Sequence, residues 1–263
     1  MAREQPPRDG EQGPSADRDV GRPIKAVIFD VGHTLVRPGI SPFTLLRDLG
    51  LDVTPDQVHR AVRPAMDEFW RRMGRDRELW ASDATIHEFW MLFYHIVLSH
   101  LGVPEERHRE LAEKIYRAYL SHHMWDLFPE VEDVLSRLHG EGYILGAVSD
   151  WQSTLLELLG HLELVRYLDF VVVSAIVGAG KPDPSLFHEA LRRAGVRPEE
   201  ALFVGDTYVT DILGARAAGM YPVLVDRSRR PAPVDCDLVR DLTGLFDVLA
   251  RLNAAPTAAG RKA

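Results

Sequence analysis

Short runs of β-branched and apolar residues alternate with helical patterns along much of the chain. The runs predict five strands, at residues 25–29, 143–148, 170–173, 201–204 and 222–225. Apolar residues at helical spacing predict a helix before the second strand, at 129–139, and helices between the later strands, at 186–191 and 212–218. Strands and helices in alternation imply a parallel sheet with helices on both faces. The predicted fold class is therefore α/β, a doubly wound parallel sheet.

Residues 38–125, between the first two predicted strands, show helical patterns and no strand pattern. Apolar residues recur at helical spacing over 58–69, 86–97 and 111–119, which predicts three amphipathic helices and a small helical bundle. We interpret its aromatic residues as core. The insertion also holds histidines whose spacings do not repeat as a metal-binding pattern, and we interpret them as surface or core residues: His87, His95, His100, His108, His122 and His123.

The two ends of the chain differ in composition from the segments between them. Residues 1–22 mix charge, Pro and Gly without an apolar core, so we expect a disordered tail and no secretory signal. Residues 253–263 look similar and are expected to be flexible. The α/β core is then assigned to 23–37 and 126–252.

Composition narrows the classes of partner. The 263 residues can bury a sizeable core, and the formal net charge of −8 opposes binding to nucleic acid. No apolar run approaches the roughly 18–20 residues of a membrane-spanning helix, so we expect a soluble protein without membrane association. The single cysteine, Cys236, fits a cytoplasmic location.

Polar residues stand where several predicted strands end, and ligands of open parallel sheets bind beyond those ends. The residues are Asp30 after the first strand, Ser149 and Asp150 after the second, and Asp206 after the fourth. Asp211 follows five residues after Asp206, and Lys181 lies between the third and fourth strands. We expect these side chains to converge on one crevice.

Each residue also has a purely structural interpretation. An Asp at a strand end such as Asp30 can form a turn with its own backbone. Asp183 followed by Pro184 is a good helix start, and Asp211 could favour the positive end of the following helix. Only the combination points to chemistry.

Two carboxylates at neighbouring strand ends form a hard-oxygen site suited to Mg²⁺, which binds one or two carboxylates together with phosphate oxygens. A lysine and a serine hydroxyl can bind the remaining phosphate oxygens. A carboxylate can then attack phosphorus as a covalent nucleophile. The combination predicts an enzyme that acts on a small phosphorylated substrate.

The order of these residues resembles the four motifs of the haloacid dehalogenase (HAD) superfamily. The motifs are "DVGHTL" from Asp30, Ser149, "KP" at Lys181, and "GD" at Asp206 with Asp211. The segments "VSDW", "GKPDP" and "GDTYVTDILGARAAGM" are especially similar to phosphatase-like members. The insertion 38–125 resembles the C1-type helical cap of that superfamily.

The resemblance implies a role for each matched residue. Asp30 would be the nucleophile that forms an aspartyl-phosphate, with Ser149 and Lys181 binding the transferring group. Asp30 and Asp206 would ligate Mg²⁺, and Asp211 would support the metal directly or through water. Gly32 would add its backbone carbonyl to the metal ligands. Asp150, where family members commonly carry Asn, would place a further negative charge close to the phosphate.

The main departure from the family pattern is Gly32. Phosphatases of the superfamily usually carry a second Asp at this position, which protonates the leaving alkoxide and activates the attacking water. General acid–base catalysis is typically worth about 10²- to 10⁴-fold, so its loss should slow turnover of poor leaving groups. His33 is a possible replacement, because its ordinary pKa lies near neutrality.

Three interpretations therefore stay open. The first is a cytoplasmic, Mg²⁺-dependent phosphatase of a small phosphorylated metabolite, which fits most features. The second is a dehalogenase or a phosphonate hydrolase. Dehalogenases of the family usually lack an acid at the position of Asp206. The phosphonate-cleaving type needs a cap lysine for a Schiff base, and Lys114 is the only lysine of the insertion. The third is a slow or inactive binding protein. The sequence does not predict an oligomeric state.

Overall fold

The computed structural model describes residues 23–73, 75–76, 78–228 and 234–254. The expected N-terminal tail and residues 255–263 lie outside the described residues. We expected residues 253–263 to be flexible. For Asn253 and Ala254 this was wrong, because both belong to helix α10 (Leu245–Ala254). The side-chain oxygen of Asn253 accepts the backbone N–H of Ile24 at 2.8 Å and thereby fastens the helix to the chain before the first strand.

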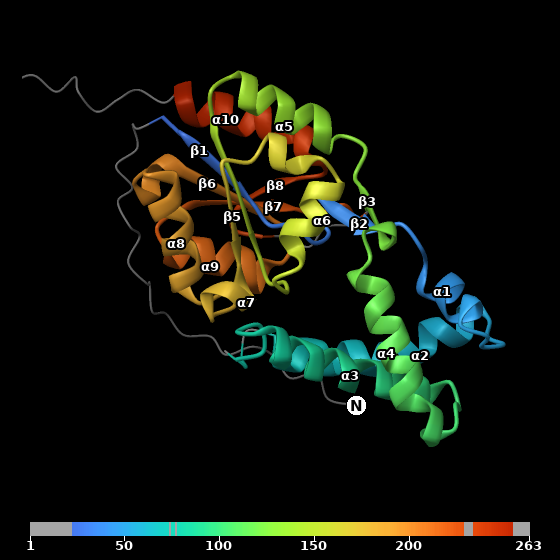
Figure 1. Ribbon diagram of the computed structural model, residues 1–263. Coiled ribbons are helices and arrows are strands. Elements are labelled where there is room, and N and C mark those ends of the chain that lie inside the picture. Colours follow the sequence, from blue (N-terminus) through green and yellow to red (C-terminus); the bar gives the residue numbers. More distant parts are fainter. Residues whose placement is uncertain (1–22, 74, 77, 229–233, 255–263) are drawn as a thin grey trace, which may run out of the picture.

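Six parallel strands form the central sheet in the order β5-β4-β1-β6-β7-β8 (Figure 1). The strands are β1 (Ala26–Phe29), β4 (Ile144–Ser149), β5 (Phe170–Val173), β6 (Ala201–Gly205), β7 (Tyr221–Val225) and β8 (Asp237–Val239). The predicted α/β fold class and all five predicted strands are confirmed. The edge strand β8 was not predicted, because a run of three residues is too short to show an alternating pattern.

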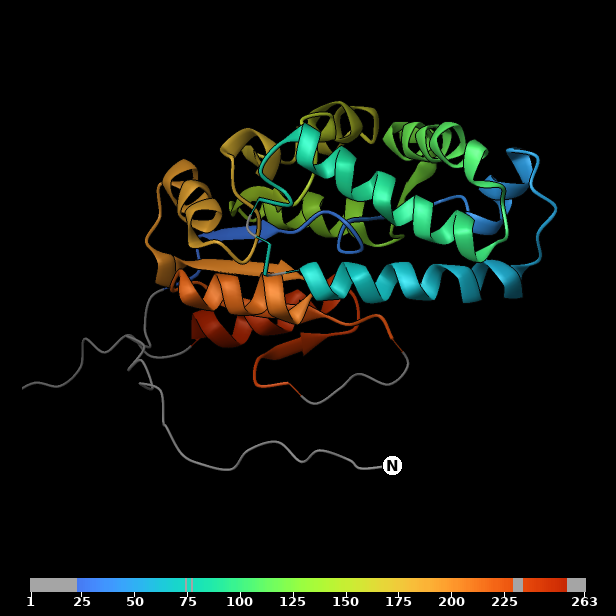
Figure 2. The ribbon, with the colours of Figure 1, turned by 90° about the horizontal axis from the view of Figure 1, so that it is seen from below.

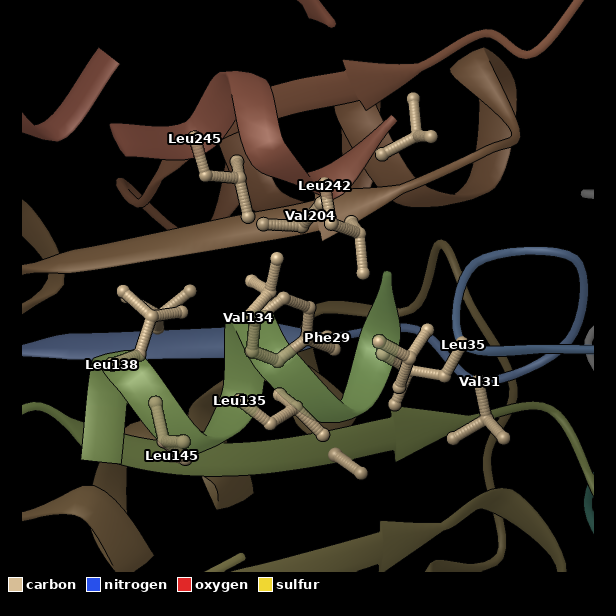
Figure 3. Close-up of a cluster of buried hydrophobic side chains, with 14 of the residues drawn as sticks. Phe29, Val31, Leu35, Val134, Leu135, Leu138, Leu145, Val204, Leu242 and Leu245 are labelled. Atoms are coloured by element: carbon tan, nitrogen blue, oxygen red, sulfur yellow. The ribbon is translucent and has the colours of Figure 1, made fainter. Parts of the chain in front are cut away.

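Alternating side chains of the strands divide between two apolar layers, as the period of two requires. In β1, Val27 and Phe29 join one buried cluster, and Ala26 and Ile28 join another. The first cluster packs the sheet against α5 (Val131–Gly140), α6 (Leu155–His161) and α10 (Figure 3). The second packs it against α8 (Pro184–Ala194) and α9 (Leu213–Ala217).

The insertion forms a separate apolar cluster, whose buried members lie between Leu45 and Met124. Its helices are α1 (Pro42–Asp48), α2 (Pro55–Arg72), α3 (Asp83–His100) and α4 (His108–Leu120). Figures 1 and 2 show α2, α3 and α4 side by side, and Figure 1 shows them apart from the helices that cover the sheet. The three predicted amphipathic helices are confirmed, and α1 was missed.

Local sequence fixes where the long helices of the insertion begin. Thr54 caps α2 in a reciprocal capping box with Gln57, and Pro55 occupies the first turn. Ser82 caps α3 in the same way with Thr85. These caps satisfy N–H groups that would otherwise lack partners at each helix start.

An antiparallel ribbon of two short strands carries the chain into the insertion and back. The strands are β2 (Val36–Pro38) and β3 (Trp125–Leu127), and Val36 pairs with Leu127. Neither strand was predicted. The ribbon starts six residues after Asp30 and therefore ties the position of the insertion to the end of β1.

The remaining short elements are α7 (Ser174–Val177), the π-helical turn η5 (Tyr208–Ile212) and 3₁₀ turns at Glu105–Arg107, His122–Met124, Leu164–Arg166, Pro198–Glu200 and Leu242–Gly244. Among the described residues, no helix combines the length and apolar character needed to cross a bilayer.

Candidate active site

The ends of three neighbouring strands supply the polar residues of one cavity. In the sheet β1 lies between β4 and β6. Asp30 follows β1, Ser149 ends β4, and Asp206 follows β6, and all three line the cavity. The backbone N–H of Asp30 donates to the carbonyl of Val204 at 2.8 Å, which extends the β1–β6 pairing up to the acidic residue. The expected convergence at the strand ends is therefore observed.

Asp30, Asp206 and Asp211 form a cluster in which one carboxylate oxygen of each lies within 4.8 Å of the others. The turn η5 brings Asp211 back toward the strand end. Its Oδ2 accepts the backbone N–H of Thr207 at 2.9 Å, and the Thr207 hydroxyl donates to Oδ1 of Asp206 at 3.1 Å. Thr207 thus orients both acids that follow β6.

The buried ammonium of Lys181 joins two of these acids. Its Nζ donates to Oδ1 of Asp30 and to Oδ1 of Asp211, each at 2.6 Å, and its side chain is only 4% exposed. The backbone N–H of Lys181 donates to Oδ1 of Asp150 at 2.8 Å. Asp150 therefore positions the segment that carries the lysine.

Burial and mutual repulsion disfavour ionisation of the acids. Burial, together with the nearby charges of Asp30 and Asp211, raises the pKa of Asp206 to about 8. Burial raises the pKa of Asp211 to about 6, and it raises that of Asp150 to about 7, although Lys181 opposes both shifts. Burial by itself lowers the pKa of Lys181, but Asp211 and Asp30 outweigh it and raise that pKa above its ordinary value. The lysine stays charged, and the acids repel one another.

The ligand atoms of the cluster are suited to a divalent cation such as Mg²⁺. Its three groups are carboxylates, which are the hard oxygen ligands that Mg²⁺ prefers. A cation between them would offset the repulsion that, together with burial, raises the pKa values of Asp206 and Asp211. Among the described residues, this is the one group of three or more metal-ligating side chains close enough to share an ion, so the histidines of the insertion do not form another.

Gly32 lines the same cavity as the cluster and has room for a Cβ atom. A Cβ at this position would meet Cζ3 of Trp151 at 3.5 Å, an ordinary contact. Both residues line the cavity, as does His33, whose backbone is left-handed with a φ of 58°. Crowding at the Cβ position therefore does not by itself require glycine at position 32.

The helices of the insertion close the opposite side of the cavity, which has a volume of about 640 Å³. The amide of Gln152 donates to the hydroxyl of Tyr116, and the backbone N–H of Ser153 donates to Asp83 at 2.8 Å. Trp80 packs against Gly180, next to Lys181. The insertion thus contacts two loops of the sheet domain that carry site residues.

The structure brings every predicted site residue to this cavity: Asp30, Gly32, Ser149, Asp150, Lys181, Asp206 and Asp211. Their catalytic and ligand roles stay predictions. Lys114 is not among the lining residues, and it is exposed and paired with Glu110 at 2.6 Å. The interpretation of the aromatic residues as core was incomplete, because Trp90 and Tyr94 also line the cavity.

Sequence reasoning missed Thr207, Trp151 and Tyr116. Thr207 and Trp151 could have been found, because each directly follows a strand-end acid. Tyr116 carried no such signal, since its partner Gln152 lies 36 residues away along the chain.

Known proteins share both the sequence and the fold. Residues 24–219 match the family model described as haloacid dehalogenase-like hydrolase. The chain is 33% identical over 207 residues to the mouse (Mus musculus) haloacid dehalogenase-like hydrolase domain-containing protein 3, covering 77% of each chain. It is 30% identical over 221 residues to a glyceraldehyde 3-phosphate phosphatase of Methanopyrus kandleri, covering 78% of this chain and 85% of the other.

A solved structure with a similar fold is the HAD phosphatase from Thermococcus onnurineus. It matches with a TM-score of 0.59 and 25% identity, over 89% of this chain and 100% of that one. The similarity therefore extends over the sheet domain and the helical insertion together.

Gly205→Ala should disrupt the acid cluster. The added Cβ would lie 2.4 Å from Cγ of Asp211, which Lys181 and Thr207 hold in place. We expect a loss of about 1–3 kcal/mol in the free energy of unfolding, measured by urea denaturation. Gly140→Ala is the control, because a Cβ there meets no atom within 4 Å. Equal stability of the two variants would contradict the close contact.

Asp206→Asn should stabilise the metal-free protein at pH 8. Because the pKa of Asp206 is raised to about 8, the folded chain binds more protons than the unfolded chain between about pH 4 and 8, and stability falls as pH rises. Asn removes this loss. A gain of about 1 kcal/mol would raise Tm by about 2–4 °C, measured by calorimetry with EDTA at pH 5 and 8.

The control for this experiment is Asp235→Asn. Hydrogen bonds from Arg216 and Tyr208 lower the pKa of Asp235 to about 2, so its removal should give no gain at pH 8. If Asp206→Asn and Asp235→Asn shift Tm at pH 8 in the same direction, repulsion within the acid cluster does not explain the shift in Asp206→Asn.

Proposed function

The chain belongs to the haloacid dehalogenase-like hydrolase family, and on this premise we propose that it is a Mg²⁺-dependent phosphatase that cleaves small phosphate monoesters. The cluster of Asp30, Asp206 and Asp211 carries this proposal, because three converging carboxylates serve a metal-assisted reaction on an anionic substrate. The relative that is named a glyceraldehyde 3-phosphate phosphatase supports the same reaction class. A cytoplasmic location is part of the proposal.

Mg²⁺ held by Asp30, Asp206, Asp211 and the backbone carbonyl of Gly32 would neutralise charge on the phosphate oxygens. Lys181 adds a fixed positive charge in the same place. The Ser149 hydroxyl lies in the same cavity and can donate to a further phosphate oxygen. The phosphate would thus bind among groups that the strand ends already hold in position.

In the first step, a carboxylate oxygen of Asp30 attacks phosphorus, and the bond from phosphorus to the ester oxygen breaks. The alkoxide leaves with that electron pair and becomes the alcohol when it receives a proton, and an aspartyl-phosphate remains. The hydrogen bond from Lys181 fixes the orientation of the Asp30 carboxylate before the attack. In the second step, water attacks phosphorus and gives up a proton to the solvent, the bond from phosphorus to the Asp30 oxygen breaks with its electron pair on that oxygen, and inorganic phosphate and the free Asp30 carboxylate result.

The leaving alkoxide needs a proton that no side chain at position 32 can supply. His33 lines the cavity and is one source, and water is another. A leaving group that is stable as an anion needs no such proton. We therefore propose that the enzyme favours esters with good leaving groups.

The helical insertion acts as a cap in this proposal. Its contacts with the sheet domain, from Tyr116 to Gln152 and from Asp83 to Ser153, would hold the closed form. Closure excludes bulk water from the reacting phosphate, as lids do in many enzymes.

Phosphatase activity should require both the metal and Asp30. We expect hydrolysis of an activated aryl phosphate with Mg²⁺, loss of activity with EDTA, and a decrease of at least about 10³-fold in Asp30→Asn. The measurement is phosphate release across a panel of phosphorylated metabolites and one aryl phosphate. If every ester is cleaved at the Asp30→Asn rate, the phosphatase proposal fails. Halide release from a 2-haloacid without metal would instead indicate a dehalogenase.

Gly32→Asp should supply the missing acid, since a Cβ at this position makes only an ordinary contact with Trp151. We expect kcat to rise by about tenfold or more on alkyl phosphates and less on aryl phosphates, whose leaving groups need no proton. Gly32→Asn is the matched control, because it has the same size without the acid. Equal gains for both variants, or for both ester classes, would contradict the role assigned to position 32.

A further inference from the structure

The cavity has two chemically different ends. The strand ends contribute its charged groups, whereas the helical insertion contributes apolar and aromatic side chains. The lining residues of the second kind include Phe69, Trp70, Trp80, Trp90, Phe93 and Tyr94. A phosphate bound at the acid cluster would therefore direct its ester group toward a wall of rings.

The rings of this wall form a continuous row across the insertion. Trp90 stacks on Phe69 with centroids 6.3 Å apart and on Tyr94 with centroids 5.8 Å apart. Tyr94 in turn stacks on Tyr119, with centroids 6.3 Å apart and an angle of 10° between the planes. The row links α2, α3 and α4 and offers apolar surface to a ligand.

The wall carries no charge that could pair with a charged ester group. Among the described lining residues, the Asp side chains, Lys181 and His33 all belong to the sheet domain, and Lys181 already pairs with Asp30 and Asp211. The tyrosines stay neutral, because burial raises the pKa of Tyr116 to about 12 and that of Tyr94 well above its ordinary value.

We propose that the natural leaving group is apolar and uncharged, so that the substrate is the phosphate monoester of an apolar alcohol or a phenol. The inference rests on the proposed phosphatase activity and narrows its substrate class. A carboxylate or ammonium on the ester group would lose its hydration against the rings without gaining a counter-charge. A cavity of about 640 Å³ also has room for a group much larger than a three-carbon metabolite.

Two lining side chains extend the apolar surface to the outside. Trp70 is 52% exposed and Leu120 is 36% exposed, although both line the cavity. Large apolar side chains in such positions are costly to leave in water and suit the passage of an apolar group.

The test compares two esters that differ only in a remote charge. Hexyl phosphate and 6-phosphooxyhexanoate have the same type of alkoxide leaving group, and only the second carries a carboxylate at the far end. We expect kcat/KM for hexyl phosphate to exceed that for the carboxylated ester by at least about tenfold. Equal values, or a preference for the carboxylated ester, would overturn the inference.

A charge introduced into the wall should change this ratio. Trp70→Arg places a cation on an exposed lining position, and we expect it to raise kcat/KM for the carboxylated ester by about threefold or more relative to hexyl phosphate. Val165→Arg is the matched control, because Val165 is 47% exposed and is not among the lining residues. If the ratio of kcat/KM for the carboxylated ester to that for hexyl phosphate is the same in both variants, the ester group does not bind at the aromatic wall.

Binding separates this inference from the phosphatase proposal. The full-length protein with Mg²⁺ is titrated with hexylphosphonate and with 5-carboxypentylphosphonate, which cannot be hydrolysed, and Kd is measured by calorimetry. If neither ester nor the activated aryl phosphate is cleaved but hexylphosphonate binds more tightly, the phosphatase proposal fails and the apolar site stands. If both esters are cleaved at equal kcat/KM and both phosphonates bind equally, the phosphatase proposal stands and the apolar site fails.

Discussion

The buried ammonium of Lys181 is the interaction on which the polar end of the cavity depends. It donates to Asp30 and Asp211, while its own backbone N–H is held by Asp150. Carboxylates that follow β1, β4 and β6 therefore meet at one residue. A buried acid without a cationic partner is strongly disfavoured, and the neighbouring acids add repulsion. The positions of the acids and the charge of the lysine are thus parts of one electrostatic arrangement.

The sheet makes this arrangement possible. Because β4, β1 and β6 are neighbours and parallel, the residues after them lie on the same edge. Apolar layers on both faces hold the strands in register, so the polar groups need no flexible loop to reach one another. Asp211 and Lys181 are the exceptions. The turn η5 and the close approach to Gly205 place Asp211 there, and Asp150 holds the loop that carries Lys181.

The cavity divides its tasks between two parts of the chain. Rigid strand ends hold the groups that would act on phosphate, and the helices of the insertion provide the surface that would meet the rest of a substrate. The ribbon of β2 and β3 connects the two parts close to Asp30. A different insertion would therefore change the preferred ester without altering the acid cluster. One fold can in this way serve several substrates.

The sequence by itself determined the α/β fold class, five of the six sheet strands and the convergence of Asp30, Ser149, Lys181 and Asp206, because strand ends are marked by local patterns. It missed β2, β3 and β8, which are three residues each and too short to show a period. Helical spacing identified Trp90 and Tyr94 as apolar, but the same spacing describes a ring in a core and a ring facing a cavity. Only the packing of α2, α3 and α4 against one another, and their contacts with loops of the sheet domain, decided that both rings line the cavity, because that choice depends on contacts between residues far apart in the chain.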